Sequence, residues 1–132
     1  MIEGAVSENR QSIVRITLVG GDTGRLELDV VVDTGFTGYL RLNEDIVEAL
    51  GLEFRNFVVN TLANGQDEQV PTYIGSVDWE GELKPITVQA INEGDHLLGM
   101  ALLSGCRLTI EAVPGGAVAI EPDMCEPFAV RR

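Results

Sequence analysis

Three consecutive valines, Val30-Val31-Val32, lead directly into the sequence Asp33-Thr34-Gly35. Counted back from Asp33, residues 26, 28, 30 and 32 are all apolar, whereas residues 27, 29, 31 and 33 are mixed. This alternation predicts a strand with one wholly apolar face, and the Thr-Gly pair predicts a turn after it. An aspartate at the end of such a strand is rarely buried without partners, so it is either bonded by its own turn or retained for a reaction.

A second motif stands about sixty residues further along the chain, where Leu97-Leu98-Gly99 precedes the apolar residues 100–103. An aspartate turn after an apolar strand resembles the active-site turn of the aspartic peptidases. Bacterial and retroviral single-domain members of that family also carry two hydrophobic residues and a glycine before a short helical turn. With both motifs in the family's order, the chain resembles the retropepsin-like aspartic peptidases. It departs from them at Phe36, where Ser, Thr or Ala is usual.

The resemblance implies an aspartic endopeptidase that acts as a homodimer on a peptide or protein substrate. Such enzymes activate a water between two carboxylates that share one proton. Because the chain supplies one credible catalytic aspartate, both copies of Asp33 would meet on a two-fold axis. Thr34 would join the two turns through hydroxyl hydrogen bonds, Gly35 would let the substrate backbone approach, and Leu97-Leu98-Gly99 would support the turn. The resemblance implies no cofactor and no metal.

The pair Asn64-Gly65 is the strongest hairpin signal in the chain. In the retropepsin-like family a hairpin in this region is the flap over the substrate, so the resemblance assigns Ala63, Asn64 and Gly65 to the flap and to substrate binding. A plain surface turn is the alternative, because nothing in the hairpin itself requires a substrate.

The remaining patterns predict more strands than helices. Alternation over residues 13–19 predicts a strand, and Asn43 and Gly51 mark the ends of a short helix. Further strands are expected near residues 57–59, 73–79, 83–91, 106–111 and 118–120, with a turn at Glu80-Gly81. Residues 1–11 would form a loose arm or an edge strand that orders only on assembly. Asp22-Thr23-Gly24 repeats the Asp-Thr-Gly triplet, but it follows two glycines, so we interpret it as hairpin chemistry.

These patterns together predict one domain over residues 1–132. Its fold class is mainly β: a closed, barrel-like domain of the retropepsin type with one or two short helices.

The negative charge of the chain limits the kinds of partner that it can bind. With 21 acidic and nine basic residues the formal charge is −12, whereas nucleic acids and anionic membranes are bound mainly through clustered Lys and Arg. We therefore expect no nucleic-acid and no membrane partner.

No run is long enough to span a bilayer and no basic and apolar leader opens the chain, so we expect a cytoplasmic protein. Cys106 and Cys125 have no metal-ligand spacing with His96, and either reduced thiols or a disulfide fits them.

Two other functions stay open at this point. The chain could be a non-catalytic peptide-binding or scaffold module with the same fold, which captures an extended peptide by strand addition. It could also be a small β domain unrelated to peptidases, in which Asp33 is only a turn residue. The oligomeric state discriminates between these readings, because a strict monomer cannot bring two copies of Asp33 together.

Overall fold

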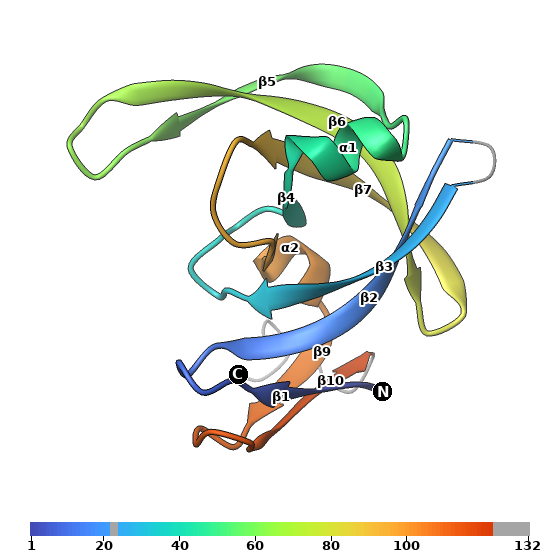
Figure 1. The fold of residues 1–132 in the computed structure, drawn as a ribbon, viewed down its shortest axis with the longest axis vertical. Coiled ribbons are helices and arrows are strands. Elements are labelled where there is room, and N and C mark those ends of the chain that lie inside the picture. The colour runs from blue at the N-terminus through green and yellow to red at the C-terminus, as the bar shows by residue number, and fades with distance from the viewer. Residues whose placement is uncertain (22–23, 123–132) are drawn as a thin grey trace, which may run out of the picture.

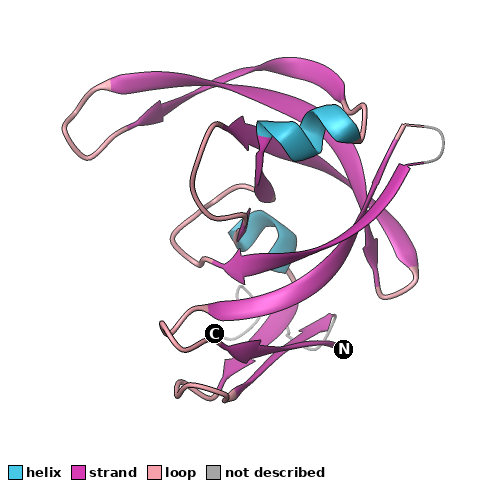
Figure 2. Ribbon diagram, in the orientation of Figure 1, coloured by secondary structure: helices cyan, strands magenta, loops and turns pink. Residues whose placement is uncertain are grey.

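The computed structural model describes residues 1–21 and 24–122, and these are mainly strands with two short helices (Figure 2). The first part of the chain contains β1 (Ile2–Val6), β2 (Ser12–Gly20), β3 (Gly24–Val32), β4 (Leu40–Asn43) and α1 (Glu44–Ala49). The second part contains β5 (Glu53–Thr61), β6 (Asp67–Trp79), β7 (Glu82–Ile91), β8 (Leu97–Leu98), α2 (Met100–Leu103), β9 (Cys106–Ile110) and β10 (Ala117–Pro122).

The described strands form one sheet in the order β5-β6-β7-β4-β8-β3-β2-β1-β10-β9. A further antiparallel pairing joins residues 17–19 of β2 to residues 76–78 of β6. It closes β6, β7, β4, β8, β3 and β2 into a ring of paired strands (Figure 1). The mainly β architecture and the two short helices confirm the predicted fold class.

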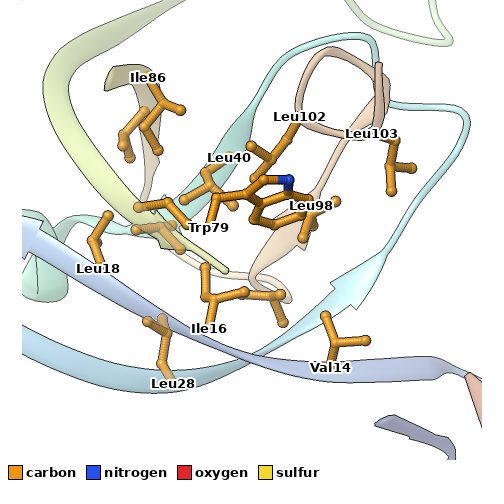
Figure 3. Close-up of a cluster of buried hydrophobic side chains, with 14 of the residues drawn as sticks. Val14, Ile16, Leu18, Leu28, Leu40, Trp79, Ile86, Leu98, Leu102 and Leu103 are labelled. Carbon is orange, nitrogen blue, oxygen red and sulfur yellow. The ribbon is translucent and has the colours of Figure 1, made fainter. Parts of the chain in front are cut away.

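Alternate residues of the strands fill the interior of this ring. Leu18, Leu40, Leu98 and Leu102 have no exposed surface, and Figure 3 shows the last three around the indole of Trp79. Trp79 is itself only 7% exposed and is part of this core. Fully burying one such side chain contributes about 1.5–3 kcal/mol, so the core holds the strands in register.

The prediction for residues 1–11 was wrong. Strand β1 pairs on both sides within the chain, because Gly4 lies opposite Val14 of β2 and Val118 of β10. The backbones approach so closely there that a Cβ on Gly4 would lie 1.9 Å from the Ile13 carbonyl oxygen. Sequence reasoning missed the strand because β1 is short and is held by its neighbours, not by a pattern of its own.

The other predicted strands, helix and turns are present, although their lengths differ, and β4 was not predicted. The Asn43 side chain accepts the Asp45 N–H at 3.3 Å and caps α1. Glu80 and Gly81 both have positive φ, as a tight hairpin turn requires. Strand β6 begins at Asp67, six residues before the expected Tyr73, because its first half pairs with β5 and its second half with β7.

Some predictions concern residues that lie outside the described part. Asp22 and Thr23 do so, and therefore the second Asp-Thr-Gly triplet stays a hairpin prediction, although β2 and β3 on either side are paired. Cys125 also lies outside, so the state of the two cysteines stays open. Among the described residues no helix has the length and apolar character needed to cross a bilayer.

Ring closure can be tested at Leu18, which is fully buried and lies opposite the equally buried Val77. We expect Leu18→Ala to lower the free energy of unfolding by about 2–5 kcal/mol, because it leaves a cavity where β2 meets β6. Leu83→Ala removes the same atoms from a side chain that is 57% exposed, and it should change the free energy by no more than about 0.5 kcal/mol. Urea denaturation measures both, and equal losses would contradict the ring core.

Candidate active site

Asp33 follows the last residue of β3, and its main chain is held by β8. The two strands are parallel, with Val31 opposite Leu97 and Val32 opposite Leu98. The Asp33 N–H donates to the Leu98 carbonyl oxygen at 2.9 Å, and the Val31 N–H donates to the His96 carbonyl oxygen at 2.8 Å. The position of Asp33 is therefore set by a ladder of main-chain hydrogen bonds.

The turn after Asp33 fixes one oxygen of its carboxylate. The Gly35 N–H donates to Asp33 Oδ1 at 2.8 Å, and the Phe36 N–H donates to the Asp33 carbonyl oxygen at 3.1 Å. Asp33 is half-buried, whereas Thr34 and Gly35 are exposed. Within the described residues the carboxylate has no ion pair. The carboxylate thus lies at the surface, and within the described residues only its Oδ1 accepts a hydrogen bond.

The second predicted motif packs against this turn. N–H groups at the start of α2 donate to carbonyl oxygens of the loop after Asp33: Gly99 to Tyr39 at 2.9 Å, Met100 to Phe36 at 2.8 Å and Ala101 to Gly38 at 3.1 Å. These contacts satisfy N–H groups that have no partner inside a helix. A Cβ on Gly99 would lie only 2.3 Å from the Gly38 carbonyl oxygen, so the close approach requires glycine. The structure therefore brings Asp33-Thr34-Gly35 and Leu97-Leu98-Gly99 together.

Phe36, the departure from the family pattern, is a packing residue. It is only 9% exposed, and its ring lies so close to Gly38 and Gly99 that a Cβ on either would overlap it. The guanidinium carbon of Arg41 lies 5.0 Å from the centre of the ring, in cation–π contact. Sequence reasoning missed Arg41, although a charged residue between the apolar Leu40 and Leu42 was a signal for it.

The predicted flap residues Ala63, Asn64 and Gly65 form the tip of the β5–β6 hairpin. The Gln66 N–H donates to Asn64 Oδ1 at 2.9 Å, and Gly65 has a φ of +84°, which favours glycine. All three are exposed, and the tip extends on the same side of the molecule as the turn after β3 (Figure 1). No hydrogen bond among the described residues joins the tip to that turn, and so the flap assignment stays a prediction.

Comparison with known proteins bears on the fold. No family model and no curated protein sequence matches the chain. Among solved structures, it matches the crystal structure of a retropepsin-like aspartic protease from Rickettsia conorii with a TM-score of 0.61 and 17% identity. The match covers 90% of this chain and 89% of that chain. The chain has a retropepsin-like fold. At 17% identity the likeness concerns the fold alone.

The packing role of Phe36 in the retropepsin-like fold can be measured. We expect Phe36→Ala to lower the free energy of unfolding by about 3 kcal/mol, because the ring fills the space between the Asp33 turn and α2. Phe54→Ala removes the same ring from a position that is 49% exposed, and its effect should be clearly smaller. A loss at Phe36 no larger than that at Phe54, in denaturant titrations of both variants, would contradict the assignment.

Proposed function

We propose that the protein is an aspartic endopeptidase that acts as a homodimer and hydrolyses peptide bonds with the two copies of Asp33. The observation that carries this proposal is the position of Asp33 at the end of β3 in a retropepsin-like fold: its carboxylate accepts the Gly35 N–H, and its own N–H donates to the Leu98 carbonyl oxygen. A half-buried carboxylate on a rigid turn is the arrangement that positioned acid–base chemistry needs.

The need for a second chain follows from the chemistry. Hydrolysis by this route uses two carboxyl groups, and the described part of one chain presents a single Asp-Thr-Gly at the end of an apolar strand. A two-fold axis beside the exposed Thr34 and Gly35 would bring in a second Asp33. Thr34 would then hydrogen-bond across the axis, and Gly35 would leave room for the backbone of the substrate.

The two carboxyl groups would divide the work. Two carboxylates so close together cannot both ionise readily, and therefore the pair holds one proton. The ionised group takes a proton from a water, whose oxygen then attacks the carbonyl carbon of the scissile peptide bond. The protonated group hydrogen-bonds the carbonyl oxygen and stabilises its developing charge. Transfer of a proton to the leaving nitrogen completes the cleavage.

A non-catalytic peptide-binding or scaffold module is the second candidate function. Phe36 favours it, because the ring replaces the residue that carries a hydroxyl in many members of the family. In that case the same dimer would hold an extended peptide beneath the β5–β6 hairpin and release it intact.

Replacement of Asp33 separates these two functions. We expect Asp33→Asn to lower peptide turnover by about 10³-fold or more, because an amide cannot take a proton from water. Asn has nearly the same volume, and its oxygen can still accept the Gly35 N–H, so the fold and the dimer should survive. Turnover of a peptide library, with and without a statine-type inhibitor, measures the effect.

The matched control is Asp29→Asn, on the same strand, where the exposed carboxylate is paired with Arg15. It should leave turnover unchanged. Sedimentation should show wild type and both variants as dimers. Turnover that survives in Asp33→Asn, or full activity from a strict monomer, would contradict the shared-carboxylate mechanism. Inhibitor binding by wild type without any cleavage would favour the binding module.

The β5–β6 hairpin provides a further prediction, because residues 61–69 are all exposed and little packing holds the tip. We expect a bound statine-type inhibitor to slow amide hydrogen exchange across residues 59–70, since the tip would gain contacts with the ligand. The β6–β7 turn at Glu80-Gly81 is the internal control and should exchange at the same rate in both states. Unchanged exchange in the hairpin of an inhibited enzyme would show that it is not a flap.

A further inference from the structure

Arg41 lies on the face of β4 that is turned away from the core. Its neighbours Leu40 and Leu42 have no exposed surface, so strand alternation directs Arg41 to the opposite face. There its register partner on β8 is Leu97, which also lies opposite Val31 of β3. Register partners share a face of the sheet, so Arg41, Leu97 and Val31 lie side by side on the neighbouring strands β4, β8 and β3. Val31 stands on the strand that leads into the Asp33 turn.

Among the described residues the guanidinium of Arg41 has no counter-ion. Its Nε is buried and has no hydrogen-bond partner among the described residues, and the ion pairs in this part of the chain involve Met1, Arg15 and Arg25 instead. The Phe36 ring beneath it holds the group in place without accepting its N–H groups. A buried donor of a charged group without an acceptor is unfavourable, and such groups are normally paired.

Arg41 also lines a pocket. The cavity has a volume of about 550 Å³ and is bordered by β4, β6, the end of β7 and the loop before β8. Leu97 and Val70 supply apolar wall, and Leu97 directly precedes the residue whose carbonyl holds Asp33. A side chain of a peptide bound at Asp33 could therefore enter this pocket and reach Arg41.

Four carboxyl groups line the same pocket, those of Glu44, Glu68, Glu93 and Asp95. Two of them have other partners: the Asn92 amide, oriented with its NH₂ toward Glu44, donates to Glu44 Oε2 at 3.0 Å, and Gln11 Nε2 donates to Asp95 at 2.8 Å. All four belong to exposed residues, whereas Arg41 is half-buried. The negative electrostatic field of these four carboxylates disfavours a highly acidic peptide. A single incoming anion can still make the direct contact with Arg41.

We propose that Arg41 determines substrate specificity by pairing with the carboxylate of an acidic side chain of the peptide, a role that rests on the proposed peptidase function. A guanidinium presents N–H groups in a planar fork that matches a carboxylate, and such charge-assisted bonds are about twice as strong as neutral ones. The ligand is thus a peptide with one glutamate or aspartate near the scissile bond, flanked by neutral or basic residues.

The test compares matched peptides on the same enzyme. A library digest at about pH 6, where glutamate is ionised, locates the cleavage sites, and peptides with Glu, Gln or Lys at each nearby position follow. We expect one position at which kcat/KM is about tenfold or more higher for Glu than for Gln. In Arg41→Gln that ratio should fall to about one, and Arg41→Lys should lie between, because it keeps the charge and loses the fork.

Arg15→Gln is the control, because it removes an arginine whose side chain is 65% exposed on β2, and its Glu-to-Gln ratio should equal that of wild type. Each ratio compares two peptides on one preparation, so it does not depend on the fraction of enzyme that folds. If wild type prefers Gln or Lys, or if the Glu preference survives in Arg41→Gln, the proposed role of Arg41 is overturned while the proposed peptidase function stands. Wild type that cleaves no peptide would overturn the proposed peptidase and the role of Arg41 with it.

Discussion

The candidate site depends on main-chain hydrogen bonds between two segments that lie far apart in the sequence. Asp33 donates to Leu98, and Gly99, Met100 and Ala101 donate back to the loop that follows Asp33. Because these bonds use backbone atoms, they constrain side-chain identity only where the two segments come too close, as at Gly99. A fold held in this way can be kept while side chains change, and this chain shares its fold with the Rickettsia conorii protease at 17% identity.

Close contact around Gly99 also explains how the site tolerates a phenylalanine. Phe36 lies under Gly38 and Gly99, where the missing Cβ atoms leave space for the ring. The large side chain therefore faces inward and does not block the turn, and its outer face carries Arg41. Phe36 thus links two features, the packing of the turn and the placement of a cation at the neighbouring pocket.

The ring of strands and the β5–β6 hairpin differ in how they are held. Strand β6 takes part in both: its second half pairs with β7 and β2 inside the ring, and its first half extends with β5 beyond it (Figure 1). On β6 the side chains of the buried core are Val77 and Trp79, whereas residues 61–69 at the tip are all exposed. A rigid base with a poorly packed tip is suited to covering a ligand, because closing the tip breaks few contacts.

The sequence by itself determined the elements whose signal is local. The alternation before Asp33, the cap at Asn43 and the turns at Asn64-Gly65 and Glu80-Gly81 all follow from backbone preferences of nearby residues, and the structure agrees with them. The pairing of the two motifs was also foreseen, but through resemblance to a family and not through periodicity.

Only the tertiary structure decided the features that depend on distant neighbours. Strand β1 is held by β2 and β10, and β6 begins early because β5 runs beside it. Arg41 contacts Phe36 and lines a pocket that is built from three separate stretches of the chain. Contacts between residues far apart in the chain leave no periodic trace in the sequence, since each depends on where the rest of the fold places its partner.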